Sequence, residues 1–262
     1  VMYAPSDNLT LMAMVNYQDN EMDSVMRMSM PHMTSDSMMN NMGNVTPMTM
    51  DTEFNTASSG MGDAKFAALF NGFNGEQYRS HFTLGVVLPT GDIDQTDNTP
   101  MREDAVLGYA MQLGGGSYQA FGAFTWVYDS QQWQWGTQLN YQTALEDNDQ
   151  DYQVGDKFLW HNWLAYTLNN DWSVSLRLSY TDQASIDGQD DRLNPMMMPT
   201  ADPKMREYSQ LDSALGVNYV VNQGTLRGHR FALEYSMPIE QDVQGVQMEL
   251  AYSLTLGWQY AF

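Results

Sequence analysis

The chain has 262 residues and carries 11 lysines and arginines against 32 aspartates and glutamates, which gives a net charge of −21. Binding of nucleic acid needs a basic face, so this balance argues against it, and the absence of cysteine excludes disulfide scaffolds and thiolate chemistry. No apolar run approaches the ~18 residues of a membrane helix, which excludes a helical membrane protein.

Alternation of apolar and polar residues recurs along the chain and predicts a series of antiparallel strands. After a stub at 1–4, the strands are expected near 9–20, 53–70, 76–89, 109–128, 133–145, 156–168, 172–186, 207–221, 228–237 and 247–262. Because successive side chains of a strand point to opposite faces, each segment has one apolar and one polar face. We interpret Gly114–Gly116, inside the segment 109–128, as a bulge or kink and not as a turn.

The C-terminal segment 248–262, MELAYSLTLGWQYAF, has the longest alternation in the chain. A half-buried strand of a soluble protein usually alternates over only about 4–8 residues. Lipid offers no hydrogen bonds to the backbone, so a closed sheet with an apolar exterior fits this pattern. We therefore predict an all-β fold, a transmembrane antiparallel up-and-down β-barrel. A β-sandwich or a lipocalin-like barrel is the alternative, but it would require a polar exterior.

Short and long connections alternate between the expected strands. Short turns fall near 5–8, 71–75, 129–132, 169–171 and 222–228, and long connections near 21–51, 91–104, 146–155, 187–206 and 238–245. Short periplasmic turns and long external loops are the rule for outer-membrane barrels, which places the C-terminus in the periplasm. Eleven strands are visible, and closed single-chain barrels have an even number, so we expect about twelve strands with one upstream of Val1. Residues 1–262 are predicted to form one barrel domain that contains 21–51 as a methionine-rich extracellular loop.

Several segments resemble one known family. They are MYAPSDNLTLMAMVNY at 2–17, SSGMGDAKFAALF at 58–70, LGVVLPTGDID at 84–94, YAMQLGGGSY at 109–118, RLNPMMMPTADP at 192–203, GHRFALEYSMPIEQDVQGVQME at 228–249 and GWQYAF at 257–262. The chain resembles the outer-membrane barrel, transporter-like proteins labelled as the MetA pathway of phenol degradation, whose members often lie near copper-handling functions. The resemblance implies a barrel in the bacterial outer membrane and brings no catalytic residues with it.

Methionine is the anomaly of the composition, with 22 residues. Thioether sulfur is a soft ligand that selects Cu(I) or Ag(I), so the clustered methionines and one histidine are candidate ligands. They are Met22, Met26, Met28, Met30, His32, Met33, Met38, Met39, Met42, Met48, Met50, Met196, Met197 and Met198. The alternative is adaptable packing, because methionine also fills irregular gaps where loops cover a barrel mouth.

A second group of residues falls on the lumen-facing phase of the strands. It comprises Met12, Met14, Asp63, Lys65, Arg79, His81, Lys157, His161, Arg177, Asp212, Arg230, Glu234 and Glu249. Both signs of charge are present, so these side chains either pair across the lumen and close it or line a narrow aqueous path. The two histidines are weak metal candidates.

Acidic residues concentrate in the expected external loops, for example in 146–151 and 187–191. Such a rim attracts cations, including calcium, and favours divalent-bridged contact with lipopolysaccharide. Expected partners are outer-membrane lipid, lipopolysaccharide, the barrel-assembly machinery, which would read the strand ending at Phe262, and a periplasmic or surface protein. No nucleic acid is expected.

No hydrolase elbow, phosphate-binding glycine loop or metalloprotease helix occurs, so we predict that the chain is not an enzyme. Three hypotheses about function stay open. The first is a channel or transporter for a small solute or a soft metal ion, copper or silver, captured by the methionine-rich loops. The second is a transporter for apolar or aromatic solutes. The third is a structural or partner-binding barrel that does not conduct.

Overall fold

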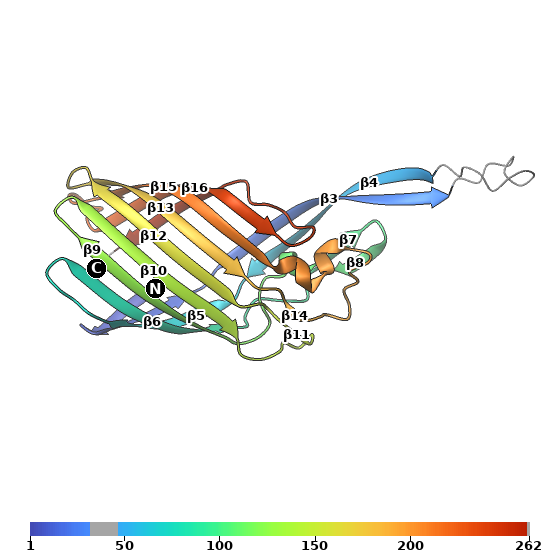
Figure 1. Ribbon diagram of the computed structural model, residues 1–262, viewed down its shortest axis with the longest axis horizontal. Coiled ribbons are helices and arrows are strands. Elements are labelled where there is room, and N and C mark those ends of the chain that lie inside the picture. Colours follow the sequence, from blue (N-terminus) through green and yellow to red (C-terminus); the bar gives the residue numbers. More distant parts are fainter. Residues whose placement is uncertain (32–46, 261–262) are drawn as a thin grey trace, which may run out of the picture.

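The computed structural model describes residues 1–31 and 47–260 and is built around one antiparallel sheet of eleven strands (Figure 1). In sheet order the strands are β1 (Met2–Ser6), β2 (Leu9–Met14), β5 (Ala64–Asn71), β6 (Tyr78–Leu88), β9 (Gln119–Asp129), β10 (Trp133–Ala144), β12 (Lys157–Thr167), β13 (Trp172–Gln183), β15 (Tyr208–Val220), β16 (His229–Val243) and β17 (Ser253–Tyr260). Sheet order follows chain order, so the predicted all-β up-and-down architecture is confirmed. In the part of the chain that the structure describes, no helix is long and apolar enough to cross a membrane.

The sheet curls into a barrel wall whose two edges are β1 and β17 (Figure 1). Both edge strands run toward the end of the barrel that carries the short turns, since Ser6 precedes the turn to β2 and Tyr260 pairs with His229. The eleven strands agree with the number expected from the sequence. The twelfth strand stays a prediction.

Strand register separates the two faces of the wall as the alternation predicted. On the inner face Gln138 lies between Thr125 of β9 and His161 of β12, whereas its neighbour Leu139 lies between Phe124 and Trp160 on the outer face. Leu139, Trp160 and most other large outward side chains are exposed. The apolar exterior excludes the soluble sandwich and lipocalin-like alternatives, because those folds bury their apolar face.

Aromatic side chains gather on the outer face near the short turns. The ring of Trp126 lies 5.2 Å from that of Trp135, and Trp133 and Tyr166 pack 4.6 Å apart, as do Trp172 and Tyr219. Amphipathic rings prefer the boundary between hydrocarbon and water, so this belt marks one membrane interface.

The long connections all lie at the opposite end of the barrel and contain small elements of their own. These are the hairpin β3 (Tyr17–Pro31) and β4 (Pro47–Met61), the hairpin β7 (Thr96–Thr99) and β8 (Arg102–Val106), the pair β11 (Tyr152–Gln153) and β14 (Asp187–Gly188), and the short 3-10 helices η2 (Tyr109–Met111), η3 (Pro199–Ala201) and η4 (Pro203–Arg206). Figure 1 shows β3 and β4 extending far beyond the barrel wall.

Three sequence-based assignments are wrong in detail. The expected strands 9–20 and 53–70 are each divided, into β2 and the start of β3 and into β4 and β5, and most of 21–51 extends the hairpin β3–β4, because its Met-x-Met spacing has the two-residue period of a strand. Gly114–Gly116 are not a bulge within a barrel strand: that strand begins only at Gln119, since glycine runs weaken strands. The last strand begins at Ser253, because the Gln241 side chain bonds both backbone groups of Leu250 and replaces the ladder there.

Candidate functional site at the mouth of the barrel

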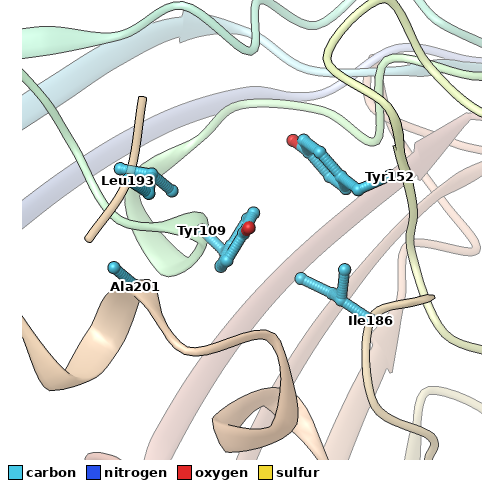
Figure 2. Packing of buried hydrophobic residues seen from close by; sticks show 5 residues of the cluster. All are labelled: Tyr109, Tyr152, Ile186, Leu193 and Ala201. Carbon is cyan, nitrogen blue, oxygen red and sulfur yellow. The ribbon is translucent and has the colours of Figure 1, made fainter. Parts of the chain in front are cut away.

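The long connections pack against one another through a small apolar core above the lumen. Figure 2 shows Tyr109 with Tyr152, Ile186, Leu193 and Ala201 around it. The Tyr109 and Tyr152 rings meet edge to face, 5.0 Å apart, and the Tyr109 hydroxyl accepts a hydrogen bond from the Asp190 N–H at 3.0 Å. Burial raises the pKa of Tyr152 to about 12. The core therefore packs the three connections 89–118, 145–156 and 184–207 into one layer over the mouth of the barrel.

An ion cluster reinforces this layer. The Asp190 carboxylate is almost fully buried and accepts bonds from Arg192 Nε and Nη2, and Arg192 Nη1 also reaches Asp94 at 2.6 Å. Burial alone would raise the pKa of Asp190, but the side-chain and backbone bonds from Arg192 outweigh it and hold that pKa below its usual range. The cluster ties the connection 184–207 to the connection 89–118.

Asp63 anchors the inner rim of the mouth. One carboxylate oxygen accepts the Gly91 N–H at 2.9 Å and the other the Gly115 N–H at 2.8 Å. A side chain at Gly114 would collide with this carboxylate, so the glycine run that interrupts the expected strand is what lets the backbone approach Asp63. The sequence placed Asp63 on the lumen wall, and the structure places it at the rim as a loop anchor.

Below this layer the lumen holds a cavity of about 360 Å³. Its charged lining consists of Lys65 on β5, Lys157 at the start of β12, Arg206 on η4, and Asp63. Amides add to the polar surface: Lys65 Nζ donates to Gln142 Oε1 at 3.4 Å, and Gln142 in turn donates to Gln119.

Arg206 and Lys157 are half-buried, and in the described chain neither side chain has a hydrogen-bond acceptor or an acidic partner. Burial lowers the pKa of Arg206 below its usual range. The cavity thus presents cationic groups whose charge the surrounding protein does not neutralise, which is an arrangement suited to an anion.

Deeper in the lumen a polar network lines the wall. Arg177 Nε donates to Glu234 Oε2 at 3.1 Å, and a second bond joins the same two groups. Arg177 also donates to Ser179, whose hydroxyl lies 2.9 Å from His161 Nδ1. The bridge crosses β15, where Ala214 is opposite Arg177 and Gly216 is opposite Glu234, and these two small residues leave room for it. A second cavity of about 380 Å³ adjoins this pair.

Most of the other charged residues predicted in the lumen form hydrogen bonds to nearby side chains of the wall. Arg79 pairs with Asp129 at the short-turn end, and Arg230 donates to Asn218 at 2.7 Å. Asp212 accepts a bond from Gln210 at 2.7 Å. His81 lies half-buried on the inner face of β6, opposite Asn71 and Thr125.

Met12, Met14 and Glu249 complete this group. Met12 faces the lumen opposite Ala67 and packs against the small apolar cluster of Ala67, Val87 and Phe121. Met14 is opposite Lys65 in the strand register. Glu249, in contrast, is exposed in the connection before β17 and is not part of a barrel strand, so its predicted place on the lumen wall is wrong.

The methionine candidates fall into three sets. Met22, Met26, Met28 and Met50 lie on one face of the hairpin β3–β4, where Met28 is directly opposite Met50, and the backbone pairs Met30 with Met48 in the same register. His32, Met33, Met38, Met39 and Met42 lie outside the described residues. In the connection 184–207, Met198 packs against the loop core, Met196 is almost fully exposed and Met197 is largely exposed.

Calcium is the ion that the acidic loops are expected to attract. Over the described ranges, no group of three or more histidine, aspartate or glutamate side chains gathers closely enough to hold a metal ion.

Sequence reasoning missed part of the mouth cavity. The glutamines Gln119, Gln142 and Gln183 are all on the polar phase of their strands, at the ends nearest the long connections, so phase and position together could have identified them. Arg206 carries no such signal, because it reaches the cavity from a short 3-10 helix within a long connection.

These features define an outer-membrane type of β-barrel, with an apolar wall, an aromatic belt and a polar lumen capped by folded connections. The chain belongs to the family described as putative MetA-pathway of phenol degradation, whose model matches residues 33–256. No match was found among curated proteins.

Solved structures share the fold. An outer-membrane channel from Pseudomonas putida F1 superimposes with a TM-score of 0.56 and 14% sequence identity, covering 97% of this chain and 76% of that one. The NanC porin gives a TM-score of 0.47 at 11% identity, covering 95% and 99% of the two chains. A Pseudomonas aeruginosa FadL homologue gives 0.43 at 12% identity, covering 98% and 62%.

Proposed function

We propose that this protein is a channel of the bacterial outer membrane that passes small polar solutes, with the long connections outside the cell and the C-terminus in the periplasm. The observation that carries the proposal is the polar cavity under the mouth, enclosed by a wall whose exterior is apolar. The similarity to an outer-membrane channel agrees with transport rather than catalysis.

The lumenal ion pairs support an open path rather than a plugged one. Arg79 and Asp129 lie on the neighbouring strands β6 and β9, and Arg177 and Glu234 lie only two strands apart, on β13 and β16. These pairs therefore run along the wall and do not join opposite sides of the barrel. The ion pairs on the wall therefore do not plug the lumen between the strands.

A transporter for wholly apolar solutes would need an apolar pocket inside the barrel. Two apolar hollows lie between outward side chains, such as Leu11, Phe66 and Leu84 in one and Phe82 and Phe124 in the other. Lipid chains would occupy such grooves in a membrane. Polar solutes therefore fit the lumen better.

Swelling of proteoliposomes in iso-osmotic arabinose tests the channel. Wild-type protein should cause swelling, because an uncharged sugar of this size can follow an aqueous lumen. Gln142→Trp, which would fill the mouth cavity, should slow swelling, whereas Leu139→Trp on the outer face of the same strand should not. Folded wild-type protein that causes no swelling would refute the proposal.

A second role has its own supporting observation, the methionine face of the hairpin β3–β4. Met26, Met28 and Met50 share that face, and Met28 and Met50 are cross-strand partners, so two thioethers lie at the separation of neighbouring strands. Soft sulfur ligands at this spacing suit Cu(I) or Ag(I). We propose that the hairpin captures such ions outside the barrel.

Calorimetric titration with Ag(I) tests this second role. Replacing Met26, Met28 and Met50 by leucine keeps apolar volume, at a cost usually below ~1.5 kcal/mol, but removes the sulfur donors. Silver affinity should fall at least about tenfold, equivalent to about 1.4 kcal/mol. Met101→Leu, at the exposed tip of β7–β8, is the matched control. Equal silver binding by the triple variant and the wild type would exclude the role.

A further inference from the structure

Cationic side chains are scarce in this chain, yet several converge on one cavity. The sequence has 11 lysines and arginines at a net charge of −21. Three of them, Lys65, Lys157 and Arg206, line the cavity under the mouth, and they come from three segments far apart in sequence. With 32 aspartates and glutamates in the chain, an acidic side chain is available to form an ion pair with nearly every lysine and arginine.

None of these three cations forms an ion pair among the described residues, although the charge of Asp63 is close enough to act on Lys65. Asp63 is the one acidic residue among the lining residues, and both of its carboxylate oxygens are already held by the N–H groups of Gly91 and Gly115. Lys65 donates only to a neutral glutamine, and the described residues offer neither Lys157 nor Arg206 an acceptor. Lys157 also lies close enough to both other cations to be repelled by them. Positive charges that are partly buried and unpaired are costly, and a bound anion would relieve the cost.

The lining of the same cavity also includes apolar and aromatic side chains. Tyr109, Tyr152, Leu113 and Ile186 line it, and the two rings are fixed by their edge-to-face contact and by the Asp190 N–H bond to Tyr109. One small cavity thus combines cationic groups with rigid apolar and aromatic groups. Its volume of about 360 Å³ is within the usual range of small-molecule sites.

We propose that this cavity is a binding site for a small organic anion, a carboxylate carried on an apolar or aromatic body. The carboxylate would bind between Lys65, Lys157 and Arg206, and the body would rest against Tyr109 and Tyr152. The inference rests on the proposed channel and adds the class of solute that the channel selects.

Calorimetric titration of the detergent-solubilised barrel with benzoate tests the site, with benzamide as the uncharged analogue of the same shape. The variants are Lys65→Gln with Lys157→Gln, and separately Arg206→Gln. Each variant removes at least one charge-assisted hydrogen bond to the carboxylate, so each should weaken benzoate binding about tenfold or more. Lys157→Arg keeps the charge and should keep binding.

Lys204→Gln is the matched control, because Lys204 is exposed on the same short helix as Arg206 and does not line the cavity. Benzoate binding that survives in this control but weakens in the cavity variants supports the site. No benzoate binding, equal binding of benzamide, or unchanged binding in folded cavity variants would overturn it. Binding does not require conduction, so a barrel that binds benzoate but fails to swell liposomes would refute the channel and leave the site standing.

Discussion

The ion pair between Arg177 and Glu234 allows a quantitative test of how the lumen wall is held. The pair joins β13 and β16 across β15, with the two side chains 29% and 25% exposed. Fully exposed pairs are worth about 0–1 kcal/mol, and breaking a buried pair costs about 3–5 kcal/mol. Their partial exposure places this pair between those limits, so Arg177→Gln or Glu234→Gln should lower the free energy of unfolding by about 1–3 kcal/mol.

A double-mutant cycle isolates the interaction itself. Unfolding of the wild type, both single variants and the double variant by urea in lipid vesicles, followed by tryptophan fluorescence, gives the coupling free energy. We expect a coupling of about 1–2 kcal/mol, because two hydrogen bonds join the same two groups. A coupling below about 0.5 kcal/mol would refute the reasoning, since independent sites differ from additivity by that much.

Two further predictions concern the connections at the mouth. Because Arg192 holds the pKa of Asp190 below its usual value, the stabilisation by this carboxylate is present above about pH 4 and is lost as pH falls through the lowered pKa. The near-ultraviolet circular dichroism of the tyrosine core should therefore weaken in strong acid, and Asp190→Asn should remove that pH step. If the long connections are extracellular, trypsin added to intact cells should cut after Lys204 and spare Arg227, which is exposed in the short turn before β16. Cleavage after Arg227 without cleavage after Lys204 would reverse the orientation.

Much of the fold was predictable because a two-residue period leaves a direct trace in the sequence. The alternation over 133–145 predicted β10 almost to its ends, and the register of Gln138 and Leu139 follows the predicted phase. The same rule, applied to Met26, Met28 and Met30, would have predicted the strand β3.

The mouth of the barrel was much less predictable, because its contacts join segments far apart in the chain. Asp63 bonds to Gly91 and Gly115, and Tyr109 accepts a bond from Asp190. No local periodicity encodes such contacts, which depend on how each connection folds back over the lumen. Phase placed Lys65 and Lys157 in the lumen, but their convergence with Arg206 needed the tertiary structure.

Recording of ionic current through the purified barrel in planar lipid bilayers tests the channel proposal most directly. With potassium chloride on both sides, insertion should give discrete conductance steps, because the lumen is polar and the described ion pairs run along its wall. Under a salt gradient, the reversal potential should show that chloride carries more current than potassium, as the cations of the mouth cavity require. Folded, inserted protein that passes no current would contradict the account.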